Sequence, residues 1–144
     1  MQDASLVHIA SHAVFSLSDP LSSGIRMGDG WLTARDFYML NLPGTRVLLN
    51  ACDSGRAEVA SSDDAFGLVR ALIAGGSSMV VSALWPVHDR SSRDFMTRLH
   101  EIWYHGNAED QMTLSGSLRR LQAEVARDGR HPASWAPFIA TGRG

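Results

Sequence analysis

An imidazole and a thiol stand at the ends of two apolar segments of this chain. His12 follows SLVHIAS, and Cys52, the single cysteine, closes RVLLNAC forty positions later. A free thiol has a pKa of about 8.5, so a nucleophilic cysteine needs a neighbouring base or cation to ionise near neutral pH. An imidazole, with a pKa of about 6.5, suits that role because it takes the thiol proton and later returns it to a leaving amine. The pair therefore indicates nucleophilic acyl transfer.

Each of these residues also has a simpler interpretation. A cysteine that closes a strand is more often a small buried hydrophobe, and a histidine after a strand is more often a structural residue. His8, four positions earlier, is interpreted as structural. His100 and His105 flank Glu101, but five helical positions turn them about 140° apart, so they do not form a zinc site on one helix face. No metal site is expected.

The elements that must position the pair follow from hydrophobic periodicity. Short branched-apolar runs alternate with segments of helical spacing, which predicts an α/β fold with a mainly parallel sheet of about four strands covered by helices. The segment 16–30, rich in Gly, Ser, Asp and Pro, is expected to be a long loop. Strands are expected at 5–11, 46–51, 77–85 and 135–142, and helices at 33–40, 62–76, 89–106 and 112–127.

Several residues collect where these strands end. Ligands and catalytic groups gather at the carboxyl ends of parallel strands, so His12 and Cys52 emerge side by side if the first two strands are neighbours. The small Ala13, and Asp53 beside the thiol, fit a rim where backbone N–H groups approach an oxyanion. The third strand delivers candidate substrate-binding residues to the same rim, Ser82, Trp85 and Asp89.

Composition limits the classes of function. The 144 residues carry a net charge of −2, and no run of Lys and Arg marks a nucleic-acid surface. No stretch approaches the roughly 20 apolar residues that span a bilayer, and the N-terminus lacks the pattern of a secretion signal. One cysteine excludes an intramolecular disulfide. We predict one cytoplasmic domain, 1–144, that needs no metal or organic cofactor and binds neither nucleic acid nor membrane.

Four longer segments together resemble a known family. HIASHAVFS, DGWLTARDFYMLNLPGTRVLLNACDSG, FGLVRALIAGGSSMVVSALWPVHD and HPASWAPFIATG are similar, in order and spacing, to the CHAT domain. This is a caspase- and separase-like cysteine peptidase domain of clan CD, usually joined to tetratricopeptide repeats. The resemblance implies a caspase-like three-layer α/β/α fold and a polypeptide substrate.

The resemblance also implies residue roles. His12 matches the general base and Cys52 the nucleophile, with the N–H groups of Ala13 and Cys52 holding the oxyanion. Asp89 matches an acidic residue that binds a basic P1 side chain, and Asp53 is a second candidate; a carboxylate there suits arginine. A position as N-cap of a helix over 90–105 is the competing interpretation of Asp89. The family often has Gly where this chain has Ala13.

The family's domain begins before its histidine-bearing strand, with two further strands and a helix. The resemblance therefore implies that this chain matches the C-terminal half of the domain. A tetratricopeptide-repeat protein or the N-terminal half is then an expected partner. The leading expectation is a cysteine endopeptidase with a Cys–His dyad. The alternatives are a catalytically silent interaction or regulatory module, or a truncated domain that needs a partner segment, and a flavodoxin-like binding domain.

Overall fold

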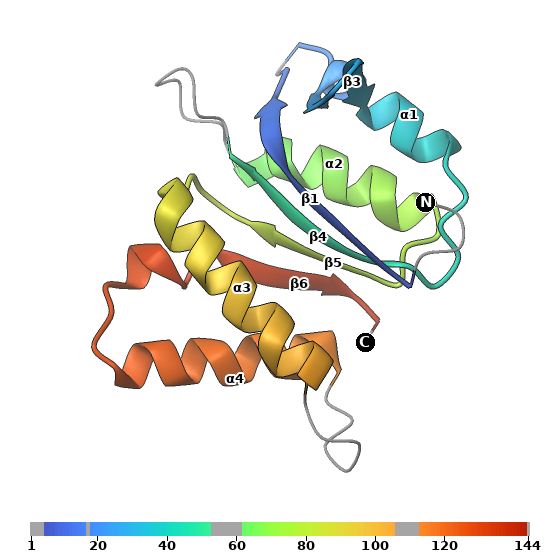
Figure 1. The fold of residues 1–144 in the computed structure, drawn as a ribbon. Helices are drawn as coiled ribbons and strands as arrows, with labels where there is room; N and C mark the ends of the chain where they lie inside the picture. The colour runs from blue at the N-terminus through green and yellow to red at the C-terminus, as the bar shows by residue number, and fades with distance from the viewer. Residues whose placement is uncertain (1–4, 17, 53–61, 106–112, 144) are drawn as a thin grey trace.

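The computed structural model describes residues 5–16, 18–52, 62–105 and 113–143 (Figure 1). In chain order the elements are β1 (Leu6–Val14), η1 (Pro20–Ser22), β2 (Gly24–Met27), β3 (Gly30–Thr33), α1 (Ala34–Met39), β4 (Arg46–Cys52), α2 (Ser62–Ala74), β5 (Met79–Ala83), α3 (Asp89–His105), α4 (Leu114–Arg127), η2 (Pro132–Ser134) and β6 (Phe138–Gly142). Strands and helices mostly alternate along the chain, except that β3 follows β2 and α4 follows α3, and two short 3-10 helices lie in the connections.

The described strands form one six-stranded sheet in the order β3-β2-β1-β4-β5-β6. β4 lies between β1 and β5 and is parallel to both. The other three pairings, β1 with β2, β2 with β3 and β5 with β6, are antiparallel. The α/β class is confirmed, but the expectation of about four mainly parallel strands was wrong, because the sheet is larger and mixed.

The two additional strands form around the segment 16–30, which was expected to be a loop. β2 lies within this segment, whereas β3 begins at its last residue, Gly30, and reaches the start of the expected helix 33–40. β2 and β3 form a hairpin in which Met27 pairs with Gly30 across the two-residue turn of Gly28 and Asp29. Each strand has only four residues, so the period-two pattern is too short to stand out. The turn residues between two apolar runs were the available signal for a hairpin.

Helices cover both faces of the sheet, which gives three layers (Figure 1). One core cluster joins α1 and α2 to the sheet through residues that include Ile9, Val47 and Leu72. The second joins α3 and α4 to the opposite face, with Leu48 and Leu99 at its centre. Alternation along β1 and β4 assigns successive residues to the two clusters, as the pleat of a strand requires. The caspase-like α/β/α expectation is consistent with this architecture.

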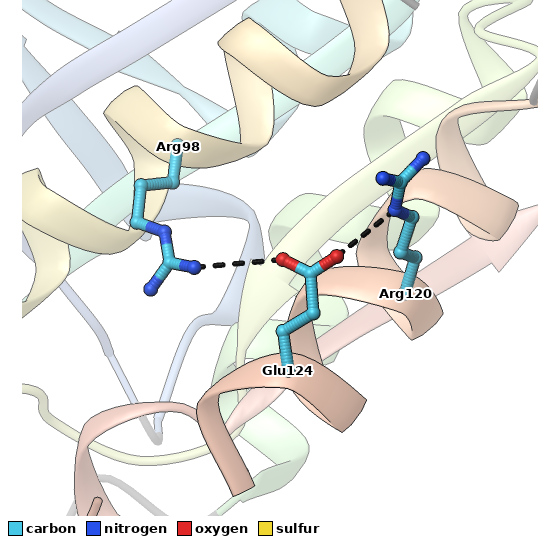
Figure 2. Close-up of polar contacts among 3 residues, drawn as sticks. All are labelled: Arg98, Arg120 and Glu124. Carbon is cyan, nitrogen blue, oxygen red and sulfur yellow. Dashed lines mark hydrogen bonds and ion pairs between the residues drawn. The ribbon is translucent and has the colours of Figure 1, made fainter. Parts of the chain in front are cut away.

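Side-chain interactions mark the start of α1 and connect α3 with α4. α1 begins with a capping box, because the Thr33 N–H donates to Asp36 Oδ2 at 2.8 Å and the Asp36 N–H donates to Thr33 Oγ1 at 3.3 Å. Figure 2 shows Glu124 of α4 between Arg98 of α3 and Arg120 of its own helix, at 3.5 and 2.9 Å. These side chains are partly exposed, so each pair contributes little to stability. Over the described part of the chain, no helix has the length and apolarity to cross a membrane.

Candidate active site

The parallel ladder between β1 and β4 places the two predicted catalytic residues opposite each other. Its register runs from Leu6 with Arg46 to His12 with Cys52, and the latter pair is the last of the ladder. The prediction that these two strands are neighbours is confirmed. The Cys52 backbone ends β4, whereas its side chain and all of Asp53 lie outside the described residues.

The alternation of β1 sorts its residues between the two faces of the sheet. Ile9 and Ala13 are buried in the cluster beneath α1 and α2. His8 and His12 belong to the opposite face, toward α3, and both line the cavity described below. Ala13 is 1% exposed and pairs with Ile25 of β2. No non-glycine residue in the described ranges has a positive φ, so Ala13 keeps an ordinary extended backbone where the family often has glycine.

A cavity of about 780 Å³ lies between β1 and α3. His12 and Asp89 both line it, so the structure brings these two predicted site residues into one space. α3 begins at Asp89 itself. Asp89 is therefore the first residue of the helix rather than the residue before it, although its carboxylate still suits the positive end of the helix dipole.

The other predicted substrate-binding residues lie elsewhere. Ser82 is 4% exposed inside β5, where it pairs with Leu49 and Ile139. Trp85 follows β5 and is 44% exposed. Neither of them lines the cavity that contains His12.

Sequence reasoning missed a polar link between the strand of Cys52 and the helix of Asp89. Asn50 lines the same cavity as His12, two positions before Cys52 on β4. The hydroxyl of Ser92, 1% exposed in the first turns of α3, donates to Asn50 Oδ1 at 2.5 Å. The only signal for this hydrogen bond in the sequence was the polar Asn50 within an apolar strand.

A second missed feature is a pair of imidazoles. His8 Nδ1 and His100 Nε2 lie 3.0 Å apart, at the far end of α3 from Asp89. Partial burial, and then the neighbouring His100, lower the pKa of His8 below its ordinary value. His8 therefore does link two elements, as its structural interpretation implied. In the part of the chain that the structure describes, no three His, Cys, Asp or Glu side chains are arranged to hold a metal ion.

Comparison of the sequence with known proteins identifies a family and two similar proteins. Residues 1–143 match the family model of the CHAT domain. Tetratricopeptide repeat protein 28 from Homo sapiens is 30% identical over 111 residues, and the Mus musculus protein of the same name is equally similar over the same length. Each alignment covers 77% of this chain but only 4% of the relative, so the chain spans a small part of the proteins that it matches.

Proposed function

The chain belongs to the CHAT domain family, and from this premise we propose that it is a cysteine endopeptidase domain with a His12–Cys52 dyad. The observation that supports the proposal most directly is the β1–β4 ladder, which ends on this pair. Facing positions of adjacent parallel strands point to the same face of the sheet, and the strands lie about 4.8 Å apart. That spacing is within reach of a thiol–imidazole hydrogen bond.

The proposed reaction has two stages. His12 takes the proton of the Cys52 thiol, and the thiolate attacks the scissile carbonyl carbon, so that a C–S bond forms. The N–H groups of Cys52 and Ala13 hold the oxyanion. His12 then gives the proton to the leaving amine as the C–N bond breaks. A water molecule, deprotonated by His12, forms a C–O bond with the acyl carbon. The C–S bond then breaks, and His12 returns the proton to the departing thiolate.

The side chain on the amino side of the cleaved bond is proposed to be basic. Support comes from Asp89, whose carboxylate shares a cavity with His12. Arginine satisfies such a carboxylate with two parallel hydrogen bonds. Asp53 remains a second candidate, and the exposed Trp85 offers an apolar surface for a neighbouring substrate residue.

The dyad is tested by the rate at which iodoacetamide labels Cys52 between pH 5 and 9. Because Cys52 is the only cysteine, the mass of the labelled protein reports this site alone. A thiol with a pKa of 8.5 is about 1% ionised at pH 6.5, so a mostly ionised Cys52 has up to about 100-fold more thiolate than free cysteine. We expect fast labelling near pH 6 that is lost in His12→Ala and kept in the control His131→Ala, since His131 lies outside the cavity.

Labelling of the folded wild type no faster than that of free cysteine contradicts the dyad. It favours the second candidate instead, a catalytically silent interaction module. Circular dichroism of each variant separates loss of reactivity from loss of fold.

The basic preference is tested with acyloxymethyl ketones that carry Arg or Leu next to the reactive group. We expect the Arg compound to inactivate the wild type at least tenfold faster, and Asp89→Asn to remove that ratio. Asp94→Asn is the matched control, because Asp94 lies on the same helix, is exposed and does not line the cavity. An unchanged ratio in Asp89→Asn would falsify this assignment without touching the dyad.

A partner with tetratricopeptide repeats is the proposed context of the domain. The curated relatives carry that repeat in their names and are far longer than this chain. A single free thiol is kept reduced most readily in a reducing compartment, which is why we propose that the domain acts in the cytoplasm. Gel filtration of the chain mixed with a tetratricopeptide-repeat segment of the human relative tests the association, and separate elution contradicts it.

A further inference from the structure

The cavity beside His12 carries more positive than negative charge. It runs along α3 from Asp89 to His100, a rise of about 16 Å at 1.5 Å per residue. Asp89 is the single carboxylate in its lining, whereas Arg90 and Arg93 contribute two guanidinium groups. Four of the six histidines of the chain also line it: His8, His12, His88 and His100.

The two arginines are available to a ligand. The carboxylate paired with Arg93 belongs to its neighbour Asp94, at 3.8 Å, and the two side chains are 73% and 65% exposed. An exposed pair of this kind contributes little and is easily exchanged. Among the described residues, neither Arg90 nor Asp89 is held in an ion pair. Asp89 and Arg93 are four positions apart on one helix, yet their charged groups are not within ion-pair distance there.

We propose that this cavity is a binding groove for an acidic segment of the protein substrate, with Asp or Glu side chains paired to Arg90 and Arg93. The proposal extends the proposed peptidase function, and it rests on that function in treating the bound segment as a substrate. Guanidinium groups bind carboxylates through two parallel hydrogen bonds, which makes arginine selective for such side chains. A rise of about 16 Å accommodates roughly five residues of an extended peptide.

The position of the arginines gives the substrate pattern. Arg93 lies one helical turn, about 6 Å, beyond Asp89, which is close to the length of two extended residues. A basic side chain on Asp89 therefore leaves an acidic side chain about two positions away within reach of Arg93. The preferred substrates combine one basic residue at the cleaved bond with acidic residues beside it.

A peptide fits this groove better than a nucleic acid does. The whole chain has a net charge of −2, so a long polyanion meets repulsion outside the groove. The acidic groups bound at the two arginines lie among imidazoles from both walls, His8 and His12 on β1 and His88 and His100 from α3 and the turn before it. Asp89 is the one lining carboxylate that repels a bound acidic side chain.

Direct binding tests the proposal without turnover. We would titrate the full chain carrying Cys52→Ala into a fluorescein-labelled peptide with one Arg followed and preceded by Glu, and measure anisotropy at low salt. The comparison peptide replaces each Glu with Gln. We expect the Glu peptide to bind at least tenfold more tightly, and the preference to shrink with added salt.

Variants assign the effect to the groove. Arg90→Gln with Arg93→Gln should remove the preference for Glu, whereas Arg70→Gln should keep it, because Arg70 is an exposed residue of α2 on the other side of the sheet. Arg90→Glu with Arg93→Glu should reverse the preference toward a Lys peptide. This reversal keeps the test decisive even if the neutral variant binds poorly for reasons of stability.

The outcomes separate the two proposals. Equal affinity for the Glu and Gln peptides overturns the groove, whatever the reactivity of Cys52. Tighter arginine-dependent binding of a single-stranded oligonucleotide than of the Glu peptide also overturns it, in favour of a nucleic-acid ligand. Selective binding of the Glu peptide together with slow Cys52 labelling supports the groove and contradicts the peptidase.

Discussion

The hydrogen bond from Ser92 to Asn50 is the direct link between the strand of Cys52 and the first turns of α3. Its two ends differ in burial, because Ser92 is 1% exposed and Asn50 is half-buried at the cavity wall. Removing one partner of a buried pair costs more when the remaining group has no access to water. The two single substitutions should therefore destabilise the protein unequally.

The magnitudes follow from that difference. Ser92→Ala leaves Asn50 Oδ1 at the cavity, where water replaces the hydroxyl, so we expect a loss of about 0.5–1.5 kcal/mol. Asn50→Leu keeps the branching and the number of heavy atoms of the side chain but leaves the buried Ser92 hydroxyl without its acceptor, which costs about 1–3 kcal/mol. The double variant removes both polar groups and should be more stable than Asn50→Leu alone. For a chain of this size, 1 kcal/mol corresponds to a Tm shift of about 4 °C.

The assay is urea unfolding followed by circular dichroism for the wild type, both single variants and the double variant. The double-mutant cycle gives the coupling energy between Asn50 and Ser92, expected at about 1 kcal/mol or more. Equal losses in the two single variants, or additive losses in the double variant, refute the argument from burial. Either result would mean that the hydroxyl finds another acceptor, of which the His88 carbonyl four positions earlier is the nearest candidate.

Three further changes test the second core and two titrating side chains. Leu99→Ala removes a side chain that is 0% exposed beneath α3, and should cost about 2–5 kcal/mol in urea unfolding; less than 1 kcal/mol contradicts the packing. Burial and the neighbouring His100 lower the pKa of His8, so below pH 6.5 the unfolded chain binds more protons at this residue than the folded chain does. The free energy of unfolding of the wild type should therefore fall as the pH falls below 6.5, and His8→Gln should reduce that pH dependence. Hydrogen bonds from Thr33 lower the pKa of Asp36 below its ordinary value of 3.8. Asp36→Asn should therefore be less stable than the wild type above pH 3.8, and the two proteins should become equally stable as the pH falls further. A difference in stability that does not change with pH refutes the capping box as the cause.

The sequence predicted most of what depends on local pattern. The capping box of Thr33 and Asp36 and the adjacency of the two strands followed from periodicity and from the tendency of sequential strands to pair. The end of the first strand was placed too early, because β1 continues past His12 to Val14 through its pairing with β2. The hairpin of β2 and β3 was missed because four residues are too few to show alternation.

The composition of the cavity was not predictable in the same way. Arg90, Arg93 and His100 meet the face of β1 only because α3 crosses it, and that crossing is set by the packing of Leu99 and its neighbours in the second core. A helical wheel identifies which residues of α3 share a side. It does not identify which strand that side faces.

The register that pairs His12 with Cys52 also has a kinetic consequence. Each pair in the β1–β4 ladder joins residues forty positions apart, with a hairpin and a helix in the intervening chain. Closing so long a loop is entropically costly before any ladder contact compensates, whereas the hairpin and helices form from neighbours in sequence. During refolding, amide protection should therefore develop in β2, β3 and α4 before it develops in β1, and Cys52 should reach its position opposite His12 among the final events of folding.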